Sequence, residues 1–481
     1  MVVMPFKQNI IGLICVLCLS ACQSGFRGSH IDTRNEPPKR FINAINNTEN
    51  QASSAHWWEQ INDPLLNQYV AQLLTDNLSL KQAIERIVQA EETKNIAQGS
   101  LFPTLSGSAD GSRNFSSSFL TNNRRLYTNN YNAALTSSWE IDLFGRIRHS
   151  VDSANNNFKA TIYDEKALVH SLIAELLRLR VEIATRQKLL ELSQETAKNR
   201  KTFYGIVENR YNLGTGATAL SDVYLAENTY QSAQADTHEH ERLLQDALYR
   251  LDILLGQLPG TSTPLQSFPL LVPPMDVPIC IPAALIDRRP DLKSSALRLL
   301  ASEADIQVAV ADLYPTLTLS GSIGFGGNST GNLFSADQLA GSILGSITSR
   351  LFEGGRLRAN IRLQESEAKE QTYSYAETVL NAFREVETNL QAEQRLEEEL
   401  AREIRSVDAI RLAESTAQTR YIRGIETLQN LLNIQQQRYQ AEQGLFSAQQ
   451  TKWNTRIALY LSLGGDWFTP NDHCEKGTET P

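Results

Sequence analysis

The sequence predicts an α+β membrane protein with two internal repeats, each of which contributes two β-strands and very long helices. Short motifs recur in the same order at a nearly constant spacing, which indicates the repeats. Segments of alternating polarity predict the strands, and a seven-residue apolar pattern in stretches without proline predicts the helices.

The composition argues against several classes of protein. The 481 residues carry 45 Lys and Arg against 54 Asp and Glu, a net charge of −9, which disfavours nucleic-acid binding as the main task. Five cysteines are too few for a disulfide scaffold. The chain shows no nucleophile, base and oxyanion arrangement, no dinucleotide loop in a strand-to-helix context and no metal-ligand set. We therefore expect no enzymatic activity, no metal and no cofactor.

The N-terminal residues predict a targeting segment. A cationic start and a short apolar run predict a signal peptide over residues 1–21. Leu19-Ser20-Ala21-Cys22 resembles a bacterial lipobox, which implies lipidation of Cys22 and a lipidated, extended segment over residues 22–60. Gln23 follows where an aspartate would resemble an inner-membrane retention signal, so we expect the outer membrane.

After removal of the signal peptide, Cys280 and Cys474 are the remaining thiols besides the lipidated cysteine. Both lie outside the long regular segments, in a compartment that permits disulfides. A Cys280–Cys474 disulfide and two unpaired thiols are the two alternatives.

Four motifs are written twice, about 210 residues apart. The first two pairs are Leu101-Phe102-Pro103-Thr104-Leu105 with Leu313-Tyr314-Pro315-Thr316-Leu317, and Leu143-Phe144-Gly145-Arg146 with Leu351-Phe352-Glu353-Gly354-Gly355-Arg356. The other two pairs are Arg210-Tyr211-Asn212-Leu213-Gly214 with Arg420-Tyr421-Ile422-Arg423-Gly424, and Leu255-Gly256 with Leu463-Gly464. These matches predict a first repeat over residues 61–258 and a second over residues 291–465. A proline-rich linker over residues 259–290 separates them, and a tail follows at residues 466–481.

Each repeat is expected to open with a helix and to continue with a β-hairpin. The hairpins are predicted at about residues 101–144 and 315–352, because apolar and polar residues alternate there. Strands of a soluble β-sandwich would show the same alternation. Here, however, the polar faces carry small polar residues rather than many Lys or Glu, and the N-terminal signal directs the chain to a membrane. We therefore predict membrane strands of a barrel. Four strands cannot close a barrel in lipid, so two or three copies of the chain must combine.

Two long helices follow each hairpin. The first repeat should form them at about residues 146–213 and 217–256, and the second at about 356–423 and 427–463. The heptads predict coiled-coil packing, although Arg186, Ser193 and Arg200 interrupt the apolar positions. Some 65 helical residues extend for roughly 100 Å, which suits a structure that crosses a periplasm.

Two charged motifs are interpreted as structural. His238-Glu239-His240 should form an exposed helix face, because helical residues two apart point away from each other. Arg288-Arg289-Pro290-Asp291 should begin a helix, since proline fits the first turn and an acidic residue complements its positive end.

In combination, these motifs resemble the NodT-type lipoprotein branch of the TolC-like outer-membrane efflux channels. The resemblance covers about residues 57–464 and includes Trp57-Trp58, Asp63-Pro64 and the paired Arg-Tyr-x-x-Gly turns. It implies a trimeric 12-stranded β-barrel, with four strands per chain, continuous with a long periplasmic α-helical coiled-coil barrel.

The resemblance also implies where the tunnel closes. In the family, polar contacts between the two repeats close the tunnel near the helical turns. The matching gate residues here are Asp222, Tyr421, Glu426, Gln429, Asn430 and Asn433. The chain departs from the family pattern, because amides stand where relatives often carry acidic rings and Glu426 replaces a basic residue. The implied docking residues for a periplasmic adaptor are Arg210, Tyr211, Gly214, Arg420, Tyr421 and Gly424.

The expected function is that of a passive outer-membrane exit duct for small-molecule efflux. An adaptor and an inner-membrane pump, which the resemblance implies to be of the RND type, supply the substrates. The expected partners are these two proteins, two further copies of the chain and outer-membrane lipids, without nucleic acid. One alternative is the exit duct of a type I protein secretion system. An alternative of another class is a structural periplasmic coiled-coil lipoprotein.

Overall fold

A computed structural model describes residues 57–61, 63–117, 125–214, 218–261 and 288–464, together with residues 42, 270 and 286. The signal peptide, Cys22, Cys280, Cys474 and the C-terminal tail lie outside the described residues.

The elements follow one another in the same order in both repeats. The first repeat contains the 3₁₀-helix η1 (Trp57–Ile61), α2 (Pro64–Asp76), α3 (Leu78–Gly99), β1 (Thr104–Ser117), β2 (Arg125–Ile141), α4 (Arg146–Asn212) and α5 (Leu220–Leu254). The second contains α7 (Pro290–Ala311), β3 (Thr316–Gly327), η3 (Thr330–Asn332), η4 (Ala336–Gln338), β4 (Leu339–Thr348), α8 (Arg356–Ile422) and α9 (Leu428–Ser462). The expected combination of very long helices with a small antiparallel sheet in two repeats is confirmed.

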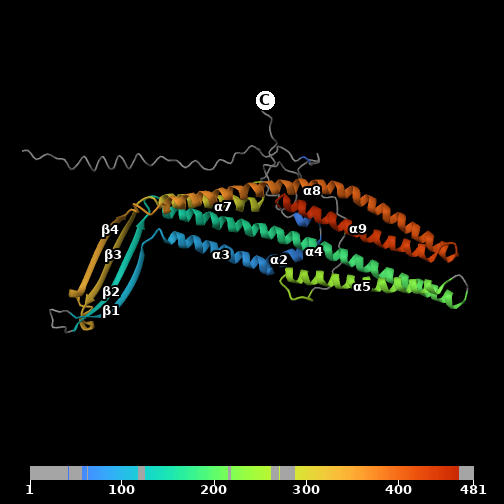
Figure 1. Ribbon diagram of the computed structural model, residues 1–481, viewed down its shortest axis with the longest axis horizontal. Coiled ribbons are helices and arrows are strands. Elements are labelled where there is room, and N and C mark those ends of the chain that lie inside the picture. Colours follow the sequence, from blue (N-terminus) through green and yellow to red (C-terminus); the bar gives the residue numbers. More distant parts are fainter. Residues whose placement is uncertain are drawn as a thin grey trace, which may run out of the picture.

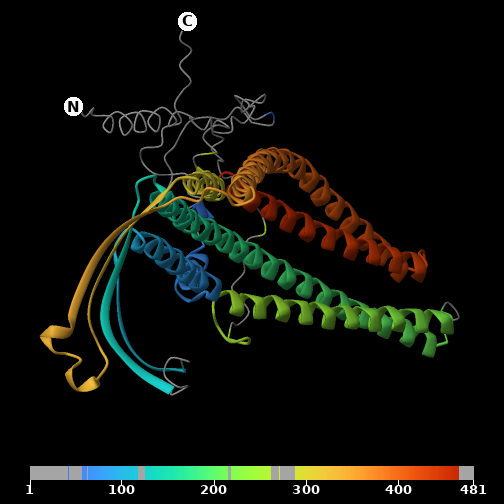
Figure 2. The same ribbon diagram turned by 60° about the vertical axis from the view of Figure 1, so that its left-hand side comes forward.

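The molecule is elongated, with the sheet at one end and two helical turns at the other (Figure 1). The α4–α5 turn and the α8–α9 turn together form the end remote from the sheet, which we call the tip. Figure 2 shows the sheet bending away from the helices, which continue as two long hairpins, α4 with α5 and a curved α8 with α9. The 67-residue helices α4 and α8 each extend for roughly 100 Å.

The four strands form one antiparallel sheet in the order β1-β2-β3-β4. Every pair joins two odd-numbered or two even-numbered residues, as in Leu135↔Ile323 and Thr318↔Ser346, so one face carries the odd positions of all strands. The large apolar residues of that face are Leu105, Phe115, Tyr127, Tyr131, Leu135, Trp139, Ile141, Leu317, Leu319, Ile323, Phe325, Leu339, Ile343 and Ile347. The even positions are mainly Ser, Thr and Asn, which gives the sheet a small-polar second face.

Local signals explain where the helices begin and end. Gly145 precedes α4 with a φ of 83°, a left-handed conformation that glycine adopts without strain. The side chain of Asp63 caps α2 by accepting a hydrogen bond from the Leu65 amide (3.0 Å), and Pro64 occupies the first turn. The motif before α7 has the structural role expected for it. Pro290 begins the helix, and the buried Arg289 donates to Glu385 (2.8 Å) and to the Ser462 carbonyl (3.3 Å).

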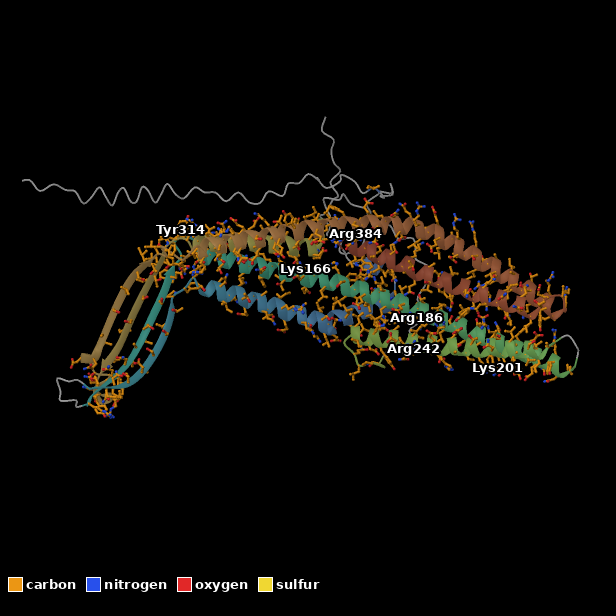
Figure 3. The ribbon with its side chains drawn as sticks, viewed as in Figure 1. Lys166, Arg186, Lys201, Arg242, Tyr314 and Arg384 are labelled. Atoms are coloured by element: carbon orange, nitrogen blue, oxygen red, sulfur yellow. The ribbon has the colours of Figure 1, made fainter. Side chains whose placement is uncertain are left out.

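The main apolar core joins both repeats at mid-length. Trp57 is buried and stacks on Tyr460 of α9 with ring centroids 5.0 Å apart. Nearer the sheet, Phe144 of the first repeat stacks on Tyr314 of the second at 4.8 Å. Figure 3 labels Tyr314 at the junction between the helices and the sheet. The repeated motifs thus meet each other in space and fix how the two hairpins enter a common sheet.

Candidate functional site

The tip is formed by two tight turns that reverse the helices. At the second turn Gly424 has a φ of 74°, and the Ile425 amide donates to the Arg420 carbonyl (2.9 Å). This bond closes the end of α8 in the manner of a Schellman motif. At the first turn the Gly214 amide donates to the Tyr211 carbonyl (3.0 Å). Both turns hold the preceding Arg-Tyr pair at the end of the molecule.

Arg210 connects the two repeats at this end. Its guanidinium lies over the ring of Tyr421, 5.2 Å from the centroid, and its Nη2 donates to the Ile422 carbonyl (3.3 Å). Tyr421 is 7% exposed, and burial raises the pKa of its hydroxyl, against the opposing charge of Arg210 and with a contribution from Asp222. The hydroxyl therefore stays neutral, and the ring serves as a platform for the cation.

An apolar cluster packs against Tyr421 and so supports the Arg210–Tyr421 contact. The ring of Phe203 lies 5.0 Å from that of Tyr421, and Val207 and Leu431 are fully buried beside them. The cluster draws on α4, α5, α8 and α9. The packing at the tip thus depends on all four long helices.

The other predicted gate residues are distributed around this contact. Asp222 caps α5 by accepting a hydrogen bond from the Ala219 amide (3.0 Å). Glu426 pairs with Arg420 of its own repeat, with Nε and Oε2 3.5 Å apart. Gln429, Asn430 and Asn433 are exposed on α9. The structure thus brings Arg210 to Tyr421 near Asp222, and leaves the three amides on an open face of the single chain.

Farther from the tip, the helices bring together charged and polar side chains, several of them buried, that sequence reasoning missed. We call this group the polar belt; its members are Arg200, His240, Arg411, Glu414, Gln436, Arg438, Tyr439 and Glu442. Arg438 is 8% exposed and donates from Nη1 to Glu442 (2.8 Å), while its Nε lies 2.6 Å from Glu414. Arg411 of α8 donates to the other oxygen of Glu442 (2.6 Å). The belt lies between the main core and the apolar cluster at the tip.

The belt also joins the first repeat to the second. Arg200 of α4 donates to the Thr229 carbonyl (3.0 Å) and to Gln436 of α9 (2.7 Å). Its position is one of the heptad interruptions visible in the sequence, which was the available signal. A charge at an apolar heptad position indicates either exposure or a buried partner, and only the packing distinguishes the two.

The expectation of a fully exposed His238-Glu239-His240 face is wrong for His240. His238 is exposed and pairs with Glu241 (3.2 Å), but the Nε2 of His240 lies 3.3 Å from the Tyr439 hydroxyl of the other repeat. Burial lowers the pKa of His240, although Asp236 and Glu239 act in the opposite direction. Burial likewise raises the pKa of Tyr439 to about 12. Tyr439 of α9 covers a face of α5 that would be exposed to solvent in the isolated helix.

We expect acidification to weaken the packing around His240. Because its pKa in the folded protein lies below the ordinary 6.5, the unfolded chain takes up this proton at higher pH. The stability contributed by neutral His240 is thus present above about pH 6.5 and is lost as the pH falls through the lowered pKa. The measurement is the melting temperature between about pH 8 and pH 5 for the wild type, His240→Gln and the exposed control His238→Gln. His240→Gln should show a shallower pH dependence than the other two proteins, and equal slopes for all three would refute the assignment.

Among the helices of the described residues, none combines the length and apolar character needed to cross a membrane. The described part of the chain also holds no group of three or more His, Cys, Asp or Glu arranged to bind a metal ion.

Comparison with protein families gives a match over most of the chain. The model of the family described as "Outer membrane efflux protein" matches residues 69–257 and 281–465, one segment in each repeat.

Individual proteins agree with the family match. The chain is 30% identical to the outer membrane protein OprJ of Pseudomonas aeruginosa over 421 residues, covering 85% of this chain and 86% of OprJ. It is 29% identical over 412 residues to the solvent efflux pump outer membrane protein SrpC of Pseudomonas putida, covering 85% and 87%. Among solved structures, the outer-membrane channel OprN superposes with a TM-score of 0.79 at 29% identity, covering 90% of this chain and 98% of OprN.

Proposed function

The chain belongs to the outer membrane efflux protein family, and from this premise we propose that its copies assemble into a duct that passively conducts small molecules out of the cell. It is an outer membrane protein, like its relatives. The observation that carries the proposal is the sheet, which has one apolar face, one small-polar face and two open edges.

The open edges argue for assembly. In the described sheet, β1 pairs only with β2, and β4 pairs only with β3. An edge exposed to lipid leaves backbone groups without partners, at several kcal/mol each. Copies that pair β4 of one chain with β1 of the next remove both edges. Three copies of four strands supply twelve, and the apolar faces then meet lipid while the polar faces line the duct.

The helices offer matching surfaces for the same assembly. In Figure 1, α3 follows the edge of the molecule that continues into β1, and α8 follows the opposite edge that continues into β4. Both helices expose large apolar residues. Those of α3 are Leu78, Ile84, Val88 and Ile96, and those of α8 are Leu363, Tyr373, Leu380, Ile404, Leu412 and Ile422. Two different apolar surfaces on opposite edges favour a head-to-tail ring, which closes as a homotrimer in our proposal.

At the tip, the Arg210–Tyr421 contact supports a closed state. It joins the end of α4 to the end of α8, so the two helical hairpins cannot separate while it persists. We place the gate at this contact, with Asp222, Glu426, Gln429, Asn430 and Asn433 around it. Opening is then a shift between two packings of the hairpins.

The tip also supports docking of a periplasmic adaptor. Tyr211 is 40% exposed, Arg420 and the glycine turns are exposed, and all lie at the end remote from the sheet. An adaptor that binds the separated hairpins more tightly would favour the open state. An inner-membrane pump, of the RND type in this proposal, supplies the energy. Relatives of this chain carry names that place them in efflux pumps.

The test is the single-channel conductance of the purified protein in planar bilayers. We expect discrete conductance steps for the wild type and a several-fold larger conductance for Arg210→Ala, because this substitution removes both the ring contact and the Ile422 hydrogen bond. The matched control is Arg423→Ala, which removes an exposed arginine at the same tip.

Complete absence of conductance in every protein would favour the structural coiled-coil alternative and reject the duct. Equal conductance of Arg210→Ala and Arg423→Ala would retain the duct but move the gate away from Arg210.

A further inference from the structure

Two arginines occupy the end of the sheet that is remote from the helices. Arg113 lies late in β1, and Arg125 begins β2. The register pairs Arg113 with Asn129, Phe115 with Tyr127 and Ser117 with Arg125. All are odd-numbered, so both arginines lie on the apolar face of the sheet.

Each arginine stacks on an aromatic ring of the neighbouring strand. The guanidinium of Arg113 lies 4.7 Å from the ring centroid of Tyr127, and that of Arg125 lies 5.7 Å from the centroid of Phe115. The two rings lie 6.3 Å apart. The two neighbouring rings thus lie between the two cations, and each ring holds one guanidinium group over the outer surface.

Neither arginine has a carboxylate partner within the described residues. Asp110, the nearest acidic residue along β1, has an even number and occupies the opposite face, where it contacts Asn132 (3.5 Å). Arg113 and Arg125 are exposed, as are Phe115 and Tyr127 at 66% and 53%. The strand end therefore presents positive charge and aromatic rings to its surroundings.

Position in a membrane determines whether this arrangement is favourable. On the lipid-facing side of a barrel, an arginine costs about 2–4 kcal/mol at the bilayer midplane but only about 0–1 kcal/mol near the interface. Aromatic residues concentrate at the headgroup level. The sheet end remote from the helices is the outer end if the helices extend into the periplasm, so both arginines lie at the level of outer-leaflet headgroups.

We propose that Arg113 and Arg125 form a binding site for an anionic lipid of the outer leaflet that carries phosphate on its headgroup. Guanidinium groups donate two parallel hydrogen bonds to a phosphate, and the aromatic rings fix the planes of the donors. The backbone positions of the two arginines are four residues apart along the paired strands, or roughly 14 Å, and each guanidinium lies on a different ring, so the site can take two phosphate groups. This inference rests on the proposed function, because it requires the sheet to be inserted as a barrel.

The test is titration of the detergent-purified protein with diphosphorylated lipid A and with the same lipid after removal of its phosphates, followed by native mass spectrometry. The wild type should prefer the phosphorylated lipid. Arg113→Gln/Arg125→Gln should bind that lipid at least tenfold more weakly, and Arg113→Lys/Arg125→Lys should fall between them. The matched control is Arg402→Gln/Arg405→Gln, which removes two exposed arginines from the middle of α8 and should bind like the wild type.

Equal binding of both lipids by the wild type, or equal binding by wild type and Arg113→Gln/Arg125→Gln, would overturn the inference. Conductance in bilayers of zwitterionic lipid separates this failure from failure of the duct. A conducting Arg113→Gln/Arg125→Gln protein with wild-type lipid binding would reject only the lipid site. A wild type without conductance would reject the proposed function itself.

Discussion

Replacing Arg438 with methionine is expected to lower the free energy of unfolding by about 3–5 kcal/mol. Arg438 is buried and neutralises two carboxylates, those of Glu414 and Glu442. Glu442 is itself 3% exposed. Without Arg438, the carboxylates of Glu414 and Glu442 would face each other in a partly dry site, where Arg411 still pairs with Glu442.

The decrease in the free energy of unfolding caused by Arg438→Met should be smaller at low pH. Burial already raises the pKa of Glu414, and the charge of Glu442 adds to this effect, while Arg438 opposes it. Removal of Arg438 therefore raises the pKa of Glu414 further in the folded protein. A group with a raised folded pKa binds its proton more tightly when folded, so acidification stabilises the folded variant relative to the unfolded chain.

The measurement is a denaturant titration in detergent, followed by helical circular dichroism at several pH values. Arg405→Met removes an exposed arginine of α8 and should change the stability by less than about 0.5 kcal/mol. The double variant Arg438→Met/Glu442→Gln removes the excess negative charge and should recover more than half of the loss. If Arg438→Met lowers the free energy of unfolding by no more than Arg405→Met does, the prediction is wrong and the polar belt is solvated.

Replacing Gly256 with alanine is expected to cost at least about 3 kcal/mol, because strain and overlap act together. Gly256 has a φ of 72°, a conformation that costs an L-residue about 1–2 kcal/mol. A Cβ at this position would lie 2.5 Å from the carbonyl oxygen of Asp76, at the end of α2. The adjacent Asn77 donates to the Leu254 carbonyl (2.8 Å), so the two chain segments cannot separate without losing a buried hydrogen bond.

Two other glycines separate the contributions to this loss. Gly260 also has a positive φ, of 96°, but a Cβ there would meet nothing within 4 Å, so Gly260→Ala reports backbone strain without overlap. Gly205 lies inside α4 with open space around it, and Gly205→Ala should stabilise the helix by about 0.5–1 kcal/mol. The measurement is the same denaturant titration. Similar losses for Gly256→Ala and Gly260→Ala would show that α2 moves aside to admit the methyl group.

Much of the architecture follows from short-range patterns in the chain. Alternation around residues 131–143 predicted the strand that the structure shows as β2, because side chains alternate between the faces of any strand. Heptads without proline predicted helices as long as α4 and α8, because helix continuation depends mainly on local backbone geometry and a periodic apolar stripe. The two repeats, the membrane-type sheet and the family resemblance could all be inferred from these patterns.

The site depended more strongly on packing between the repeats. The Arg-Tyr-x-x-Gly motif occurs twice, yet Arg210 reaches Tyr421 of the other repeat, whereas Arg420 pairs with Glu426 of its own. The same motif makes unlike contacts, because Glu426 follows the second copy where Gly216 follows the first, and because Arg210 alone of the two reaches the ring of the other repeat. The shared Arg, Tyr and Gly positions by themselves do not predict which arginine contacts the other repeat.

By itself, the sequence determined the order, the type and the length of the elements, since these follow from periodicity, proline placement and glycine turns. The tertiary structure alone decided which charges are buried, as in the polar belt, and which face His240 presents to Tyr439. The physical reason is that burial and pairing join side chains from different helices, which are 199 residues apart for His240 and Tyr439. The free energies of these contacts depend on the distance and solvent access that only the packed helices define.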